Sequence, residues 1–187
     1  MPVNISRRLP AYAALERENV FVMPDDRAAL QDIRPLELAI LNLMPNKIDT
    51  ETQLLRLIAN SPLQSNVVLL RTETYDPKNT PIEHLRAFYH TFDEIKTAGA
   101  KFDGLMITGA PVETMEFADV AYWQELKDVL AWAEHNVYST LYICWAAQAG
   151  VYLRYGIGKS PLPRKLSGIF EHRVLDKTDP LTRGFDD

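Results

Sequence analysis

The stretch Thr140-Leu141-Tyr142-Ile143-Cys144-Trp145-Ala146-Ala147-Gln148-Ala149, residues 140–149, decides the fold. A run of apolar β-formers gives way at Cys144 to helix-forming residues, which predicts a strand that turns sharply into a helix. A side chain at such a turn faces the first unpaired N–H groups of the helix. Their partial positive charge favours a thiolate, and they can also receive an oxyanion. Cys144 is therefore a candidate nucleophile.

The same residue has a second interpretation. Cys144 is the only cysteine of the chain, and free cysteine is among the residue types most often buried as a small hydrophobe. An elbow nucleophile usually has small residues two positions to either side, and here Ala146 is small whereas Tyr142 is not. From the residues alone, a core cysteine and a nucleophile both stay open. A single cysteine excludes an internal disulfide.

Length and charge limit the classes of protein. The chain of 187 residues fits one domain, 1–187. A net charge of -5, without a local cluster of Lys and Arg, predicts a small-molecule partner and no nucleic acid. The four histidines lack the paired spacing of a zinc site, so we expect no metal. No stretch is apolar enough for a signal peptide or a membrane span, so we expect a cytoplasmic protein.

Short apolar runs, each of the first three followed by helical periodicity, predict parallel βαβ units. The fold class that we expect is α/β, a flavodoxin-like parallel sheet with helices on both faces. The runs predicted as strands are 36–43, 66–72, 102–108 and 139–144. The predicted helices are one around 54–58, one continuous helix over 82–95 that begins with a capping box of Thr80 and Glu83, and one over 120–130 capped by Asp119.

The two ends of the chain differ from this pattern. Prolines punctuate residues 1–35, which predicts an N-terminal arm that packs over the domain or a neighbouring subunit and need not join the sheet. Glycines and prolines over 156–163 predict a surface loop.

Open parallel sheets bind ligands at the carboxyl ends of their strands. The predicted strands exit into 42–47, 108–111 and 144–145. This placement brings Lys47, Gly109 and Cys144 to one rim.

These exits, read in order, resemble motifs of the homoserine O-acyltransferases of methionine biosynthesis, whose fold is that of the class I glutamine amidotransferase-like group. The resemblance covers essentially the whole chain. Its segments are Glu18–Met23, Ile33–Leu36, Leu41–Lys47, Asn60–Gln64, Phe102–Leu105, Thr108–Pro111, Asp119–Trp123, Cys144–Ala146 and Lys165–Gly168.

The resemblance implies a reaction. In that family the elbow cysteine attacks acyl-CoA to form an acyl-thioester enzyme, and the hydroxyl of L-homoserine then resolves it to the O-acyl ester. Cys144 is the implied nucleophile, acyl-CoA is a substrate and no cofactor is expected. The backbone N–H of Trp145 and one from the Gly109-Ala110 turn are the expected oxyanion donors. A homodimer is also implied.

Three further side chains receive roles from the resemblance. Lys47 matches a lysine of the first strand-exit motif and would steady the thiolate or meet an acidic group of substrate; without the resemblance it is a solvated lysine before a helix. Lys165 corresponds to the lysine that binds substrate and would meet the homoserine carboxylate. Glu113 stands where the family has glycine with succinyl-CoA and glutamate with acetyl-CoA. A glutamate would repel a succinyl carboxylate, so acetyl-CoA is the expected donor.

One departure from the family is visible. The histidine and glutamate of its triad, spaced His-x-Glu, would lie beyond Asp187, so we expect a chain that lacks the family's C-terminal part and, as it stands, largely lacks transfer to homoserine. His172, the only histidine after the elbow, receives no catalytic role. The alternatives are a succinyl-CoA donor, an inactive fragment, an amidotransferase-like cysteine hydrolase, and a flavodoxin-like binding module.

Overall fold

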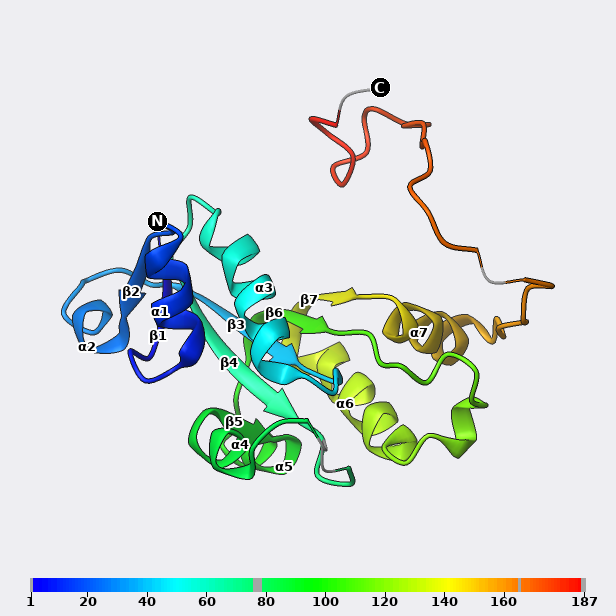
Figure 1. The fold of residues 1–187 in the computed structure, drawn as a ribbon, viewed down its shortest axis with the longest axis horizontal. Helices are drawn as coiled ribbons and strands as arrows, with labels where there is room; N and C mark the ends of the chain where they lie inside the picture. Colours follow the sequence, from blue (N-terminus) through cyan, green and yellow to red (C-terminus); the bar gives the residue numbers. More distant parts are fainter. Residues whose placement is uncertain (1, 76–78, 165, 186–187) are drawn as a thin grey trace.

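A parallel sheet of seven strands forms the centre of the computed structural model, which describes residues 2–75, 79–164 and 166–185 (Figure 1). The strand order is β2-β1-β4-β3-β6-β7, and β5 pairs with β4 outside this path. Each pairing within these ranges is parallel, so the predicted α/β class is confirmed. The strands are β1 Val3–Ile5, β2 Val22–Pro24, β3 Leu36–Leu41, β4 Ser65–Arg71, β5 Tyr89–Thr91, β6 Phe102–Ile107 and β7 Val137–Tyr142.

Helices cover both faces of this sheet, as predicted. The helices are α1 Pro10–Arg17, α2 Asp25–Ala28, α3 Lys47–Ala59, α4 Ile82–Phe88, α5 Phe92–Thr97, α6 Trp123–Asn136 and α7 Trp145–Tyr155, with a 3₁₀ turn η1 at Phe117–Asp119. One core cluster joins the sheet to α1, α3 and α4, and the other joins it to α5, α6 and α7.

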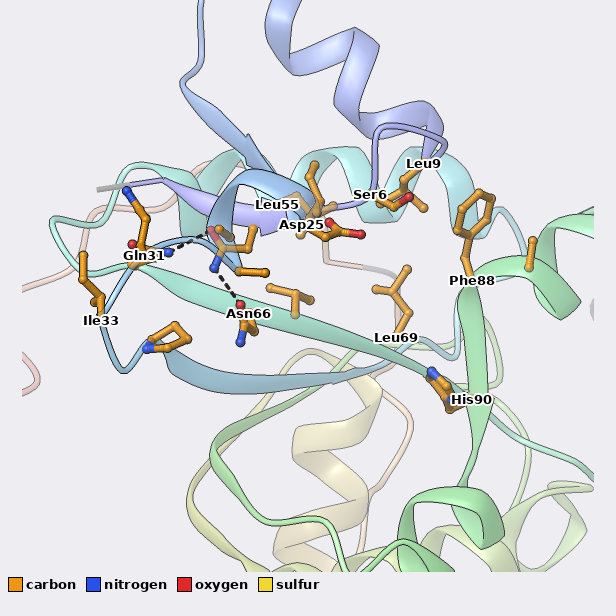
Figure 2. A pocket seen from close by; sticks show the side chains of 18 residues that line it. Ser6, Leu9, Asp25, Gln31, Ile33, Leu55, Asn66, Leu69, Phe88 and His90 are labelled. Atoms are coloured by element: carbon orange, nitrogen blue, oxygen red, sulfur yellow. Dashed lines mark hydrogen bonds between the residues drawn. The ribbon is translucent and has the colours of Figure 1, made fainter.

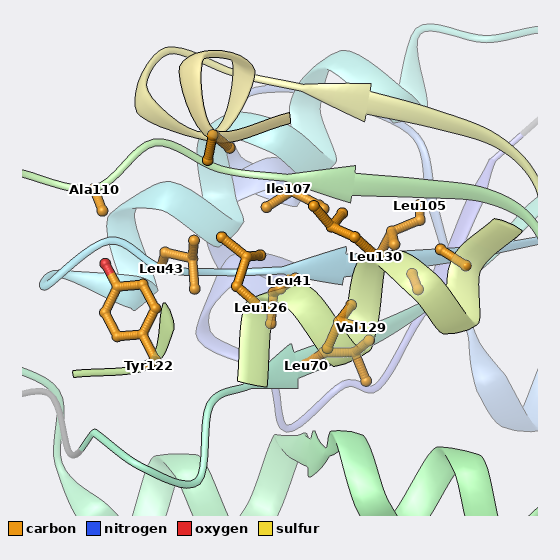
Figure 3. Close-up of a cluster of buried hydrophobic side chains, with 14 of the residues drawn as sticks. Leu41, Leu43, Leu70, Leu105, Ile107, Ala110, Tyr122, Leu126, Val129 and Leu130 are labelled. Carbon is orange, nitrogen blue, oxygen red and sulfur yellow. The ribbon is translucent and has the colours of Figure 1, made fainter. Parts of the chain in front are cut away.

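The alternation of side chains along β6 explains the two clusters. Leu105 and Ile107 belong to the cluster that contains α6, whereas Met106 between them packs against the other cluster. Successive strand residues point to opposite faces, so one strand supplies both cores. Figure 3 shows the α6 side, where Leu126 and Val129 face the sheet. These cores hold the carboxyl ends of the strands in a fixed arrangement.

The prediction of one continuous helix over 82–95 is wrong. The chain leaves the helix at Phe88, pairs with β4 as β5, and re-enters a helix at Phe92. The capping box is formed by Thr91 and Glu94, not by Thr80 and its partner. Periodicity could not reveal the break, because Tyr89 is buried both in a helix pattern and in the strand.

Two other expectations differ from the structure. The segment 1–35, expected as an arm, contributes β1 and β2 to the sheet. Asp119 ends the 3₁₀ turn and does not cap α6, which begins at Trp123. The exposed loop over 156–163 is confirmed. Within the ranges that the structure describes, no helix has the length and apolar character needed to span a membrane.

Candidate active site

Cys144 stands at a strained turn between β7 and α7. It is the residue before the helix, and its backbone has φ 56° and ψ -118°. Residues with a side chain rarely adopt a positive φ, and such strain concentrates at functional sites. Cys144 is also exposed, so the core-cysteine interpretation is wrong. The structure therefore presents a thiol on a sharp elbow at the carboxyl end of β7.

The exit of β6 lies directly against this elbow. A Cβ atom placed on Gly109 would stand 3.0 Å from Cys144 Cβ and 3.4 Å from its Sγ. Only a glycine lets the Gly109-Ala110 turn approach the thiol this closely. On the helix side, Ala146 N–H donates to the Ile143 carbonyl at 3.1 Å. Trp145 precedes it at the first helical position, where backbone N–H groups lack an acceptor within the helix.

The strain at Cys144 predicts an unusual ranking of stability. We expect the free energy of unfolding of Cys144→Gly to be about 1 kcal/mol higher than that of Cys144→Ala, because only glycine adopts this backbone without strain. The usual order is the reverse, since glycine loses more entropy on folding. Urea unfolding of both variants measures the difference. A more stable alanine variant would contradict a strained elbow.

Lys47 is buried, and the solvated-lysine interpretation is wrong. It begins α3 with 4% of its surface exposed. Its ammonium donates to the carbonyl oxygen of Asn42, where β3 ends, and to that of Met44 at 3.4 Å. Its ammonium also lies 5.8 Å from the centroid of the Tyr89 ring. Lys47 therefore holds the turn that leaves β3.

Glu51, one helical turn after Lys47, is fully buried at the centre of a polar cluster. His84 Nε2 lies 2.9 and 3.1 Å from its two carboxylate oxygens, and the Tyr89 hydroxyl donates to Oε1 at 2.5 Å. Asn42 Nδ2 in turn donates to the Tyr89 hydroxyl at 3.0 Å. Burial raises the pKa of Glu51, and the hydrogen bonds from Tyr89 and His84 partly offset this. The cluster joins α3, α4 and β5 to the exit of β3.

Sequence reasoning missed this cluster. The spacing of Lys47 and Glu51, four residues apart on one helix, was a usable signal for a charged pair. Nothing local pointed to His84, because its partner comes from another helix. The part of the chain that the structure describes places no group of three or more His, Cys, Asp or Glu side chains that could hold a metal.

A hydrogen bond connects the exit of β3 to the exit of β6. Leu43 N–H donates to Thr108 Oγ1 at 2.8 Å, and Thr108 Oγ1 also donates to the Gly109 carbonyl at 3.1 Å. Gly109 then contacts Cys144. The polar cluster, the two strand exits and the elbow thus form one continuous set of contacts.

Burial of Lys47 predicts a pH-dependent stability. Burial lowers its pKa from 10.5 to about 8, the Glu51 carboxylate partly offsets this, and the Arg71 charge adds to it. Between these pH values the unfolded chain binds the Lys47 proton more tightly than the folded chain does. The loss of stability caused by burying the charged ammonium is therefore complete below about pH 8 and disappears as the pH rises toward 10.5. From pH 7 to pH 10 we expect the free energy of unfolding of the protein to rise by about 2 kcal/mol relative to that of Lys47→Met.

Urea unfolding at several pH values measures this gain. The exposed Lys101 provides the control, because Lys101→Met should follow the parent protein at each pH. A constant difference between the protein and Lys47→Met would show that the ammonium carries no burial penalty.

The remaining candidates are Glu113, Ala110 and Lys165. Glu113 is exposed on a turn after the exit of β6, and its carbonyl accepts from Lys159 Nζ at 2.7 Å. Ala110, the expected second donor of the oxyanion site, is buried in the turn against Cys144. Lys165 lies outside the described residues.

A cavity of about 600 Å³ lies elsewhere in the molecule (Figure 2). It lies beside β4. On this strand β1 pairs with Ser65 and Asn66, and β5 pairs with the residues from Leu69 onward. Its polar lining includes Asn4, which donates to Asn66 Oδ1 at 2.6 Å. None of the candidate residues that the structure describes lines this cavity. The rim of strand exits around Cys144 is therefore the candidate active site.

Comparison with known proteins identifies the family to which the chain belongs. A family model described as homoserine O-succinyltransferase matches residues 2–187. The homoserine O-acetyltransferase of Desulfovibrio desulfuricans is 61% identical over 100% of this chain, which covers 59% of that protein. The homoserine O-acetyltransferases of Thermotoga petrophila and Acetivibrio thermocellus are each 59% identical over 100% of this chain, with 60% and 61% of their own lengths covered. The chain thus spans about three fifths of the length of these relatives and belongs to the homoserine O-succinyltransferase family.

Proposed function

We propose that this chain carries the nucleophile of an acyl transfer from acetyl-CoA to the hydroxyl of L-homoserine. The main support for the proposal is the exposed thiol of Cys144, which stands on a strained elbow close to the Gly109-Ala110 turn. Membership of the family and the names of the relatives support homoserine as the acceptor and an acyl group as the group transferred. Acetyl-CoA as the donor comes from the family resemblance and from Glu113. The place in methionine biosynthesis and a homodimer rest on the family resemblance alone, and a cytoplasmic location rests on the sequence, in which no stretch is apolar enough for a signal peptide or a membrane span.

The first half of the reaction uses groups on this rim. The Cys144 thiolate attacks the thioester carbonyl of acetyl-CoA, and the carbonyl oxygen becomes an oxyanion. Backbone N–H groups of Trp145 and Ala110 are the proposed donors to it. The C–S bond to coenzyme A then breaks, coenzyme A leaves as a thiolate, and the acetyl group stays on Sγ. One thioester replaces another, so this step is nearly balanced in energy.

The second half releases the enzyme. The hydroxyl oxygen of L-homoserine attacks the acetyl carbon, its proton passes to a base, and Cys144 leaves as a thiolate with O-acetyl-L-homoserine as product. Lys165 is the proposed partner of the homoserine carboxylate. We assign no base among the described residues. A cysteine hydrolase would use the same first step with water as acceptor, and release of acetate without homoserine would favour that alternative.

Glu113 gives a test of the donor. The parent chain should form an acetyl adduct faster than a succinyl adduct, because the Glu113 carboxylate repels that of succinyl-CoA. In Glu113→Gly we expect the ratio of acetyl to succinyl adduct rates to fall by about tenfold or more, which corresponds to about 1.4 kcal/mol. Intact-protein mass spectrometry with each donor measures both rates.

A neighbouring acid serves as the control for this variant. Glu116→Gly removes the same charge from an exposed position on the same turn and should leave the ratio unchanged. A parent chain that prefers succinyl-CoA would overturn the choice of acetyl-CoA as donor.

A further inference from the structure

Lys159 lies in the loop after α7, and its ammonium reaches the turn that carries Glu113. Its Nζ donates to the carbonyl oxygen of Glu113 at 2.7 Å and also to that of Met115. The same ammonium lies 5.0 Å from the centroid of the Phe117 ring. One side chain thus ties the segment 113–117 to the residues that follow the elbow helix.

The turn over residues 110–115 also has backbone hydrogen bonds between its own residues. Val112 N–H donates to the Ala110 carbonyl at 2.9 Å, and Met115 N–H donates to the Val112 carbonyl at 3.1 Å. Both bonds join residues of one turn, so they set its shape and not its direction relative to the rest of the molecule. Lys159 comes from a different segment, and its charge strengthens the bonds to the two carbonyls.

Both ends of the turn are fixed by other contacts. At one end, Gly109 packs against Cys144. At the other end, Phe117 stacks on Trp123 with centroids 5.0 Å apart and on Tyr152 with centroids 4.7 Å apart. The exposed residues 113–116 lie between these anchors, and the Lys159 ammonium holds two of their carbonyls.

We propose that Lys159 is a positioning residue for the choice of acyl donor, because it fixes the place of Glu113 relative to Cys144. The inference rests on the proposed function, in which the Glu113 carboxylate repels a succinyl group. Repulsion between two carboxylates weakens with distance and with exposure to water. A Glu113 that moves freely discriminates less than one held in a single position.

A direct role of the Lys159 charge predicts the opposite sign. If its ammonium attracted the succinyl carboxylate, loss of the charge would weaken binding of succinyl-CoA and strengthen the preference for acetyl-CoA. If Lys159 acts through Glu113, loss of the charge weakens that preference. The direction of the change therefore separates the two roles.

The experiment uses Lys159→Met, which keeps the length of the side chain, and Lys159→Arg, which keeps the charge. Lys96→Met is the matched control, because Lys96 Nζ also lies over a ring, that of Phe92 at 5.8 Å. Hydrogen exchange followed by mass spectrometry reports the mobility of residues 112–116. The concentrations of acetyl-CoA and succinyl-CoA that halve alkylation of Cys144 by iodoacetamide report how readily each donor blocks the thiol, by binding over it or by acylating it.

We expect Lys159→Met to speed exchange over 112–116 by about tenfold and to lower the preference for acetyl-CoA over succinyl-CoA in this assay by about fivefold. Lys159→Arg should retain most of the preference, and Lys96→Met all of it. The double variant Lys159→Met with Glu113→Gly should have the same preference as Glu113→Gly alone, because one residue acts through the other.

Unchanged exchange in Lys159→Met, a stronger preference for acetyl-CoA, or additive effects in the double variant would each overturn the inference. If neither acyl-CoA slows alkylation of the parent chain, the proposed function fails and the role of Lys159 in donor choice fails with it. Faster exchange in Lys159→Met would then still support Lys159 as the anchor of the turn.

Discussion

Replacing Glu51 with alanine is expected to lower the free energy of unfolding by about 3–5 kcal/mol, because the change removes one partner of a buried charged cluster. Glu51 has no exposed surface, and it accepts from Tyr89 and lies against His84. In Glu51→Ala these side chains stay buried without their acceptor, and Lys47 loses the negative charge that favours its protonated form. Each polar group left without a partner costs about 1–3 kcal/mol.

Urea unfolding of the parent chain and the variant measures this loss. Glu134→Ala is the matched control, because Glu134 is an exposed glutamate on α6 and its removal should change stability by less than about 0.5 kcal/mol. Glu51→Gln keeps the side chain's shape and should cost less than alanine. Equal stability of Glu51→Ala and Glu134→Ala would show that the cluster contributes nothing to the fold.

Replacing Gly109 with valine is expected to slow acetylation of Cys144 by about a hundredfold or more, because a shift of about 1 Å at a reacting group has an effect of this size. A Cβ at this position meets Cys144 Cβ at 3.0 Å, and valine adds two methyl groups beyond it. The strained elbow must then move, or the Gly109-Ala110 turn must retreat. Either change separates the thiol from the proposed oxyanion donor at Ala110.

Two variants keep this result separate from misfolding. Gly158→Val serves as the control, since a Cβ there meets nothing within 4 Å. Gly109→Ala should fall between the parent chain and valine. The rate of acetyl adduct formation and the midpoint of urea unfolding are measured together. Parent-like acetylation in Gly109→Val would exclude a site formed by this turn and Cys144.

The central strands and the place of the elbow cysteine could be predicted from the sequence. Apolar runs of Ile, Leu and Val mark β3, β4 and β6, because parallel strands are buried on both faces. The change from β-forming to helix-forming residues at Cys144 marks the elbow. Both features depend on residues adjacent in the chain.

The features that sequence reasoning missed depend on contacts between distant residues. Tyr89 forms a strand because β4 is available as a partner, although its helical periodicity favours one long helix. Thr80 resembles a cap, but its hydroxyl instead donates to the Pro45 carbonyl at 3.1 Å and accepts from Lys47 N–H at 3.2 Å. The environment of Glu51 likewise comes from three separate elements. Tertiary contacts, and not local propensity, decided these positions.

The role of Cys144 as the nucleophile is tested most directly by the mass of the intact chain after mixing with acetyl-CoA, compared with that of Cys144→Ala. We expect an acetyl adduct on the parent chain, located by peptide mapping at Cys144, and no adduct on the variant. An adduct of equal amount on Cys144→Ala, or an adduct on a lysine of the parent chain in place of Cys144, would contradict the assignment of Cys144 as the nucleophile.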